Sequence, residues 1–394
     1  MEKYQSFDLE EYKPTLLTCI YCYCGLCIEG CPVYRVTLNE SYATRGLSQI
    51  AYALLSGDID LKDIPDSLVY ACTGCRWCEW NCSMNTPRYI VEHGNRLNKV
   101  SGATITELFR AMRVESGEIP TQIKDALNSL IKFGNPYGLP KDKKDKWVEE
   151  RGLKLNGQDT VLYVGALVPY EERATAEANA LIDVLQNAGI EFGIIGGEEL
   201  DSGAFARPMG EEGMFREMVE HNIELFKENN IKKIICLSPH DYDTFKSYYE
   251  DLDGVEVKHY TEVLWELIEA GKIKPVKDLR KKVTYHDPCY LGRRHEIFDI
   301  PRNILKSIPG LELVEVKGWT RERSFCCGGG GVGLFYKPPG INLDLIRADQ
   351  LKETGAELVA VACPQCHQTL EDAMKTRDYN IEVKSIAEII KDVI

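Results

Sequence analysis

The sequence lacks any apolar run of the roughly 18 residues that a membrane-spanning helix needs. Its opening stretch, MEKYQSFDLEEYKP, is polar and acidic, which argues against a secretory signal. Basic residues are scarce relative to acidic ones, since 47 Lys and Arg against 61 Asp and Glu give a net charge of −14. This balance excludes nucleic acid as an expected partner and is typical of a solvated surface. We therefore expect a cytoplasmic globular protein that reaches the inner face of a membrane only through a partner subunit.

The cysteine usage does not indicate a disulfide framework. The chain has 15 cysteines, an odd number, and no export signal is recognisable. With 394 residues it is long enough for two or three domains. All but one of the cysteines fall into three groups, and the spacing within these groups predicts metal sites.

The clearest group is CTGCRWCEWNC, which has the spacing C-x2-C-x2-C-x3-C. One tight loop of this kind wraps three thiolates around an iron–sulfur cube, while the fourth cysteine reaches a second cluster. A zinc site more often shows two separated C-x2-C pairs. The predicted ligands of this motif are Cys72, Cys75, Cys78 and Cys82.

The stretch CIYCYCGLCIEGCP is the companion motif, but it is irregular. Cys24, Cys27 and Cys31 fit C-x2-C-x3-C-P, whereas Tyr21 occupies the position expected for the remaining cysteine. This pattern indicates one inserted residue in the loop, and either of two flanking cysteines can supply the displaced ligand. These two candidates are Cys19 and Cys22.

The last cysteine of each ferredoxin motif is expected to ligate the cluster of the other motif. Cys31 then completes the cluster of the second motif, and Cys82 completes that of the first. The two predicted sets are Cys31, Cys72, Cys75 and Cys78, and Cys24, Cys27 and Cys82 with Cys19 or Cys22. The alternative, in which all five thiols of the opening stretch bind one unusual centre, stays open.

The segment ATRGLSQIAYALLSG between the two motifs predicts an amphipathic helix. Leu47, Ile50, Ala51 and Leu54 follow the spacing i, i+3, i+4 and i+7, and a glycine follows as a stop signal. A compact βαβ ferredoxin has no obvious room for such a helix. We therefore expect a helical domain that holds the two clusters near each other between helices.

The third group of cysteines is spread over HDPCYLGR, SFCCGGGGVG and ACPQCHQTL. The β-type runs KKVTYH and ELVAVA precede two of these segments. Cysteines just after strands can converge at the carboxyl edge of a parallel sheet. Adjacent cysteines serve one cubane poorly because their side chains diverge, but they can bridge or cap a more open cluster. The candidate ligands are Cys289, Cys326, Cys327, Cys363 and Cys366.

The glycine run after Cys327 does not indicate a dinucleotide fingerprint, because it follows a Cys-Cys pair and not a strand that opens a βαβ unit. We expect Gly328 and Gly329 to let the backbone approach the cluster closely. The sequence shows no recognisable motif for a flavin or a haem.

The segment from 158 to 275 resembles the C-terminal part of the chain without its thiols. Aligning the prolines of KKIICLSPHDYDTF and LVAVACPQCHQTL matches residues of other types to four cysteine positions. The aligned residues are Asp201, Ser202, Ser238 and Asp241, opposite Cys326, Cys327, Cys363 and Cys366, and Ala166 lies near the place of Cys289. None supplies the soft thiolate that iron–sulfur chemistry selects. We predict a metal-free repeat with a structural role, in which Cys236 is a buried apolar residue.

The predicted fold is α plus α/β. In the first repeat, TAEANALIDVLQNAG and EEGMFREMVEHNIELFKEN predict helices, and VLYVG, EFGII and KKIICL predict strands of a parallel sheet with helices on both faces. The expected units are a helical domain with two [4Fe–4S] motifs (1–100), a helical linker or docking segment (101–155), a cluster-free repeat (156–275) and a cysteine-bearing repeat (276–394).

Several basic residues near the third cysteine group are further candidates. They can receive an anionic substrate or protonate a leaving thiolate, or they can be structural or solvated. These residues are Arg293, Arg294, His295 and His367. His286 precedes Asp-Pro at a strand-to-turn junction and is expected to be structural.

Paired ferredoxin motifs followed by Cys-x36-Cys-Cys-Gly-x34-Cys-x2-Cys resemble the CCG-domain iron–sulfur oxidoreductases. The resemblance is strongest to the D subunit of heterodisulfide reductase and to the K subunit of the Dsr complex, and it covers nearly the whole chain. The iron–sulfur subunits of glycolate, lactate and glycerol-3-phosphate oxidation share the layout. GNPYGLP, HDPCYLGR and SFCCGGGG are also similar to these proteins. The chain departs from members that carry two intact CCG motifs, because it keeps only the second.

The resemblance implies three clusters. Two cubanes belong to the ferredoxin motifs, and a non-cubane [4Fe–4S] cluster belongs to the five candidate cysteines of the third group, which then form the catalytic site. Its implied chemistry is the reduction or formation of a disulfide in a thiol substrate or partner protein. The partners implied are other subunits of a redox complex: a flavoprotein, an iron–sulfur subunit or a membrane cytochrome b.

Two alternative functions stay open. In the first, the chain only transfers electrons for a partner flavoprotein, such as a hydroxyacid oxidase or an acyl-CoA-linked enzyme, or for a membrane cytochrome. In the second, the clusters are structural parts of a redox-regulated scaffold.

Overall fold

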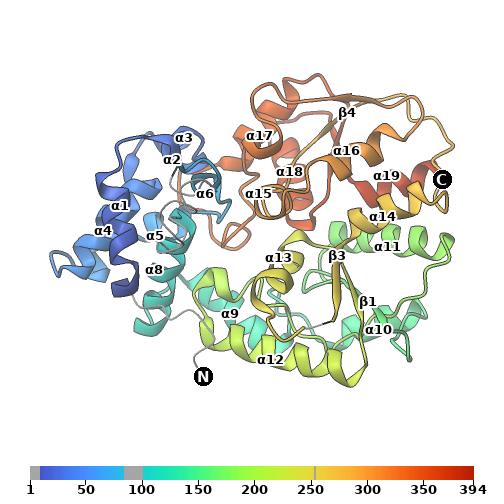
Figure 1. Ribbon diagram of the computed structural model, residues 1–394, viewed down its shortest axis with the longest axis horizontal. Helices are drawn as coiled ribbons and strands as arrows, with labels where there is room; N and C mark the ends of the chain where they lie inside the picture. Colours follow the sequence, from blue (N-terminus) through green and yellow to red (C-terminus); the bar gives the residue numbers. More distant parts are fainter. Residues whose placement is uncertain (1–8, 84–100, 253) are drawn as a thin grey trace.

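The computed structural model describes residues 9–83, 101–252 and 254–394 (Figure 1). A helical domain, drawn in blue, lies beside two α/β lobes that are stacked on each other, one green to yellow and one orange to red (Figure 1). This arrangement confirms the predicted fold class. The boundaries of the four predicted units stay predictions, and parts of the first unit, 1–8 and 84–100, lie outside the described residues.

Short helices joined by cysteine-bearing loops build the helical domain. These helices are α1 (Lys13–Tyr21), α2 (Leu26–Glu29), α3 (Pro32–Thr37), α4 (Thr44–Leu55), α5 (Asp66–Ala71) and α6 (Trp77–Trp80). The predicted amphipathic helix is α4, whose Leu47 and Ala51 are buried against its neighbours while Ile50 and Leu54 are partly buried. α4, which lies between the two cysteine motifs in the sequence, is the longest of these helices, and α1 packs along it.

Three helices connect this domain to the lobes: α8 (Gly102–Ser116), α9 (Thr121–Phe133) and α10 (Asp142–Glu150). Ser101 caps α8, because its Oγ accepts hydrogen bonds from the backbone N–H groups of Ala103 and Thr104. The charged stretch KDKKDKWVEERG forms α10, and its Lys144 and Val148 are buried against the first lobe. One face of this segment is therefore already covered.

The first lobe contains a parallel sheet in the order β1-β2-β3, with β1 (Thr160–Tyr163), β2 (Lys233–Cys236) and β3 (Glu256–His259). In its register, Val161 pairs with Ile234, and Ile234 with Val257. The predicted strand EFGII makes only isolated bridges, from Gly193 to Val161 and from Ile194 to Lys154. A different segment pairs with it on each side, and each segment pairs at one residue only. No continuous strand pairing therefore forms along either edge.

The second lobe contains a parallel sheet in the order β5-β4-β6-β7. Its strands are β4 (Lys282–Tyr285), β5 (Glu312–Val314), β6 (Leu358–Val361) and β7 (Glu382–Ser385). KKVTYH and ELVAVA thus form the two central strands, as predicted. The order matches that of the first lobe when Gly193 is placed beside β1, so the two lobes are repeats of one topology.

Helices cover the sheets of both lobes. In the first lobe they are α11 (Glu172–Asn187), α12 (Glu212–Glu228), α13 (Pro239–Tyr248) and α14 (Tyr260–Glu269); in the second they are α15 (Gly292–His295), α16 (Asp299–Lys306), α17 (Leu343–Lys352), α18 (Pro364–Thr376) and α19 (Ile386–Val393). α11 packs against α18 and α19, and α14 packs against α16. Each lobe therefore covers one face of the other.

Within the described ranges, no helix is both long enough and apolar enough to cross a membrane.

Candidate metal centres

Four cysteines from the two N-terminal motifs surround one cavity of the helical domain. Its lining includes Cys31, Cys72, Cys75 and Cys78, with Thr44, Leu47, Trp77 and Gly102. Cys72 directly follows α5, and left-handed backbone at Gly74 (φ 66°) and Arg76 (φ 53°) turns the loop before α6 begins at Trp77. Cys31 reaches the same cavity from the other motif, as the N-cap of α3. These are the four cysteines expected to share one cluster if the last cysteine of each motif ligates the cluster of the other motif.

The donor set of this cavity suits a [4Fe–4S] cluster. Four sulfur atoms lie together, and burial raises the pKa of the Cys31 thiol well above its ordinary value and that of Cys78 to about 12. Without a metal these thiols would stay protonated, whereas iron displaces the protons. The backbone N–H of Gly102, at the start of α8, donates to Cys78 Sγ at 3.3 Å. Hydrogen bonds of this kind stabilise metal-bound thiolates.

A second cavity brings the remaining N-terminal cysteines together. Its lining includes Cys19, Cys22, Cys24, Cys27 and Cys82, with Thr18, Thr44 and Arg45. Both candidates for the displaced ligand line it, but they differ in surroundings. Cys19 is buried, with Cys27 and Cys82 as interacting neighbours, and burial raises its pKa to about 12. Cys22 Sγ lies 3.3 Å from Cys24 Sγ on the more open side.

The five cysteines of the third group converge at the carboxyl edge of the second sheet. Cys289 follows β4, and Cys363 follows β6 as the N-cap of α18, with Cys366 in the first turn of that helix. The exposed fractions of the five residues are 8% for Cys289, 2% for Cys326, 3% for Cys327, 0% for Cys363 and 3% for Cys366. The centre is therefore sealed from bulk water.

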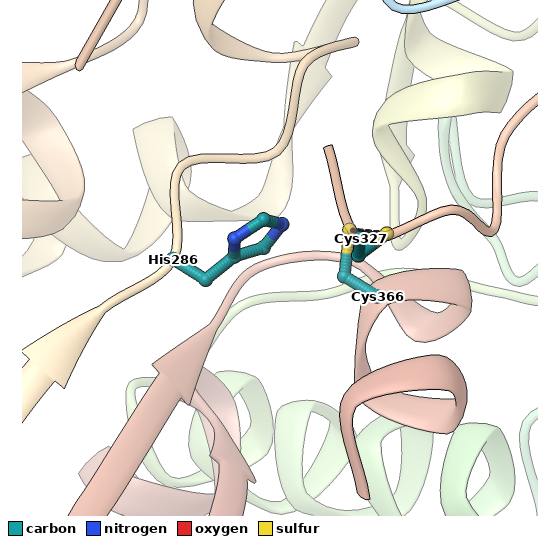
Figure 2. Close-up of side chains that lie close together, drawn as sticks. All are labelled: His286, Cys327 and Cys366. Carbon is teal, nitrogen blue, oxygen red and sulfur yellow. Dashed lines mark hydrogen bonds between the residues drawn. The ribbon is translucent and has the colours of Figure 1, made fainter. Parts of the chain in front are cut away.

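The adjacent cysteines have different further neighbours, although their own sulfur atoms also interact with each other. Cys327 Sγ lies 3.4 Å from Cys366 Sγ (Figure 2). Cys326 instead packs with Cys289 and with Cys75 of the helical domain. The pair thus reaches two sides of one site, which suits a more open cluster than a cubane.

Hydrogen bonds lower the pKa of the Cys327 thiol. The thiols of Cys326 and Cys366 interact with its sulfur, and together with His286 they hold the pKa of Cys327 well below its ordinary value despite burial. The same contacts between sulfur atoms raise the pKa of Cys326 and the pKa of Cys366. A negative charge is therefore favoured on Cys327 even before metal binds.

His286 is a site residue that the sequence did not identify. Ligand atoms of His286, Cys327 and Cys366 lie within 4.8 Å of one another, and the imidazole points toward the two sulfur atoms (Figure 2). We expected a structural role because the residue precedes Asp-Pro at a strand end. Its position three residues before Cys289 is the sequence feature that could have indicated a role at this site.

The glycine run contacts the other domain as well as the cysteines. The N–H of Gly328 donates to Cys326 Sγ at 3.4 Å, and that of Gly329 donates to Cys327 Sγ at 3.5 Å. A Cβ atom on Gly330 would lie 2.5 Å from the carbonyl oxygen of Thr73. The run is glycine-rich here because the loop between Cys72 and Cys75 presses against it.

The predicted basic candidates are engaged in bonds within the protein. Arg293 Nε donates to the carbonyl oxygen of Cys75, and His367 Nε2 lies 3.1 Å from the carbonyl oxygen of Val383. Arg294 and His295 both contact Asp243 of the first lobe. Although burial opposes it, the Arg294 guanidinium, with His295, lowers the pKa of Asp243 to about 2.

The polar residues at the aligned positions of the first lobe bond to oxygen and nitrogen groups. Ser202 Oγ donates to Asp241 Oδ1 at 2.6 Å. Ser238 is the N-cap of α13, as Cys363 is of α18, and its Oγ donates to Gln365 Oε1 of the second lobe at 3.1 Å. Polar bonds occupy the place that thiols have in the second lobe.

Two family models match the chain: a 4Fe-4S dicluster domain over residues 15–86 and a cysteine-rich (CCG) domain over residues 283–371. The first lobe lies between these matches.

Several proteins are similar over most of this chain. A probable iron–sulfur-binding oxidoreductase, FadF, of Bacillus subtilis is 34% identical over 88% of this chain and 49% of its own length. The EtfAB:quinone oxidoreductase of Syntrophomonas wolfei is 31% identical over 92% and 51%. The D subunit of the dihydromethanophenazine:CoB–CoM heterodisulfide reductase of Methanosarcina barkeri is 29% identical over 94% and 92%. The chain thus spans about half the length of the first two relatives and nearly all of the third.

A crystal structure of a hypothetical protein from Helicobacter pylori is similar in fold, with a TM-score of 0.59 at 12% identity, over 98% of this chain and 75% of that one.

Proposed function

Because the chain belongs to the family of iron–sulfur proteins that join a 4Fe-4S dicluster domain to a cysteine-rich CCG domain, we propose that it is an electron-transferring oxidoreductase subunit with three [4Fe–4S] centres in series. Such clusters supply reversible one-electron transfer when bound. The protein provides the thiolates, excludes water and adjusts each potential through hydrogen bonds and burial.

Each centre has a proposed ligand set. Those of the cubanes are Cys31, Cys72, Cys75 and Cys78, and Cys19, Cys24, Cys27 and Cys82; that of the non-cubane centre is Cys289, Cys326, Cys327, Cys363 and Cys366. We choose Cys19 over Cys22 because Cys19 is buried among the other thiols of its cavity, whereas Cys22 lies at the rim beside Cys24.

The observation that carries the proposal is the junction between the two cysteine-rich domains. Thr73 lies between Cys72 and Cys75, and its Oγ1 is 3.3 Å from Cys326 Sγ. Cys75 and Cys326 also share one buried cluster with Cys289. These contacts support a series in which the second-motif centre lies between the other two, with the non-cubane centre at one end and the first-motif centre at the other.

Burial favours an electron relay over direct chemistry on a large substrate. None of the five thiols of the third group is more than 8% exposed. At the other end of the series, Cys24 is exposed, and Tyr21 and Tyr23 beside it are 70% and 76% exposed. We propose that a redox partner, such as a flavoprotein, an iron–sulfur subunit or a membrane cytochrome, exchanges electrons at this exposed end.

The relay is tested on anaerobically isolated protein by iron analysis and by rapid mixing with a one-electron reductant that is too large to enter the fold. The wild type should contain iron for three centres, and the first-motif centre should be reduced before the non-cubane one. In Cys72→Ser, loss of the middle centre should slow reduction of the non-cubane centre by at least tenfold. Iron for only two centres, with the third set of thiols free or bound to zinc, would contradict the proposal.

A second candidate function is the cleavage or formation of a disulfide at the non-cubane centre. It is favoured by the likeness to the D subunit of heterodisulfide reductase over 92% of that protein. It is also favoured by a cavity, lined by Thr73, Gly328, Tyr336 and Lys337 among others, that opens next to Cys326. Under this candidate, a small disulfide added to the reduced protein should oxidise it and yield two thiols. Under the relay alone, the protein should stay reduced.

A further inference from the structure

Buried arginines near the candidate centres fall into two groups that differ in how their charge is balanced. Arg302 makes two hydrogen bonds to Asp287, and Arg294 pairs with Asp243. Arg110 and Arg293, in contrast, form no ion pair with a carboxylate among the described residues and donate to carbonyl oxygens, including those of the cluster-loop cysteines. These bonds join Arg110 to Val69, Cys72 and Pro208, and Arg293 to Cys75, Glu322 and Ser324.

Arg347 is the third such arginine, and it is fully buried beside the third cysteine group. Its guanidinium donates to uncharged groups, which are His286 Nδ1, Trp319 O, Gln350 Oε1 and Ser324 Oγ. Among the residues that the structure describes, no carboxylate forms an ion pair with it. A buried cation is costly without negative charge close by. Asp287, which is paired with Arg302, supplies part of that charge, and thiolates of Cys327 and Cys366 add to it.

The bond between Arg347 and His286 fixes the tautomer of the imidazole. Arg347 Nε lies 3.1 Å from His286 Nδ1, and an arginine nitrogen can only donate. Nδ1 must therefore accept, which leaves the proton of a neutral ring on Nε2. The remote end of the ring faces Cys327 and Cys366 (Figure 2).

We propose that Arg347 and His286 form a positioning pair for the non-cubane centre, in which Arg347 holds the imidazole so that Nε2–H donates a hydrogen bond to the Cys327 thiolate. This inference rests on the proposed ligand set of that centre. It assigns His286 as a hydrogen-bond donor and not as a ligand, because binding iron through Nε2 would move the ring proton to Nδ1, against the N–H of Arg347.

The pair stabilises the more negative, reduced state of the centre. An N–H donor withdraws electron density from the thiolate sulfur, and the nearby guanidinium adds a fixed positive charge. The reduction potential of an iron–sulfur cluster depends on the hydrogen bonds to its sulfur atoms and on the net charge around it. The pair should therefore raise the reduction potential of this centre alone, which favours electron flow toward it from the middle centre.

The test compares two variants at one position in holoprotein prepared anaerobically. His286→Phe keeps the ring volume but removes the donor, whereas the side-chain amide of His286→Gln can still donate. Redox titration followed by electron paramagnetic resonance should show the midpoint potential of the non-cubane centre shifted downward in His286→Phe and largely restored in His286→Gln. The potentials of the two cubanes should not move in either variant.

Arg110→Gln is the matched control, because Arg110 is also buried without an ion pair among the described residues but donates to Cys72 O. It should lower the potential of the second-motif centre and leave the non-cubane centre unchanged. In the wild type labelled with nitrogen-15 histidine, pulsed spectroscopy should show the weak coupling of a hydrogen-bonded nitrogen. This measurement does not depend on whether a variant folds.

Four results would overturn the assignment. An unchanged potential in His286→Phe would show that no donor acts on the centre. Strong nitrogen coupling in the wild type, or loss of the third centre's iron in both His286 variants, would identify a ligand. Iron for only two centres in the wild type would overturn the proposed function and this inference together, whereas the other results overturn this inference alone.

Discussion

The two lobes share one topology but differ at the carboxyl edge of the sheet. In the second lobe, this edge gathers five buried thiols. In the first lobe, the matching edge holds Asp201, Ser202 and Asp241, and Lys144 of α10 donates to Gly165 O and to Glu199 Oε1. An ammonium group and hydrogen-bonded carboxyls thus lie where the other lobe concentrates thiolates. The comparison shows that the scaffold tolerates either chemistry, so the edge residues decide whether a lobe is a metal site or a support.

The largest difference between the lobes is expected when the paired positions Cys327 and Ser202 are substituted. Cys327→Ala should remove the non-cubane centre and its spectroscopic signature, because Cys327 is buried among the candidate ligands and its sulfur lies 3.4 Å from that of Cys366. Iron should fall to the content of two cubanes. Ser202→Ala should leave the iron content and all three signals intact. Equal iron content in wild type and Cys327→Ala would show that the lobes do not differ in this way.

A smaller effect is expected from the ammonium group of the first lobe. Lys144 and Glu199 are both buried, with 2.7 Å between Nζ and Oε1. Lys144→Met should lower the free energy of unfolding by about 3 kcal/mol, because it leaves a carboxyl group buried without its partner. Anaerobic chemical denaturation measures this change, and the iron content should stay that of the wild type.

Lys146→Met is the control for Lys144→Met, since it breaks an exposed pair with Asp142 on the same helix. Its cost should be too small to resolve by denaturation, because water screens an exposed pair. If Lys144→Met also lost iron from the second lobe, the first lobe would be more than a support.

The smallest expected effect is a pH dependence confined to the first lobe. Burial raises the pKa of Asp201 to about 6 from 3.8, even though the N–H groups of Gly203 and Phe205 oppose the shift. A carboxyl group whose pKa is raised on folding costs stability as pH rises from about 4 through 6. Asp201→Asn keeps an acceptor for both N–H groups and cannot ionise. Relative to the wild type it should gain about 1–2 kcal/mol between pH 4 and pH 7, measured by denaturation at both values; a constant difference would contradict the shifted pKa.

The sequence predicted the features that depend on local spacing. The helix over Thr44–Leu55 followed from apolar periodicity, and the grouping of Cys31 with the second motif agrees with the spacing of both motifs. The likeness of the two lobes followed from matched prolines, which begin α13 and α18 at equivalent places.

Contacts between distant segments could not be predicted in the same way. Arg347 reaches His286 across 61 positions, and Thr73 reaches Cys326 across 253. Such contacts depend on how helices and lobes pack, which no local pattern encodes. The predicted strand EFGII failed for a related reason, because pairing by different segments on its two sides limits it to isolated bridges.

The close fit of Gly330 against the carbonyl of Thr73 has a consequence for how the holoprotein is made. Once the two loops have met, the five thiols behind them are closed off from any delivering scaffold protein. Under the proposed function, maturation would then follow an order, in which iron and sulfide enter the C-terminal lobe before the helical domain docks. A larger residue at Gly330 would hold the two parts open, and the mature protein would be easier to load but also easier for oxygen to damage.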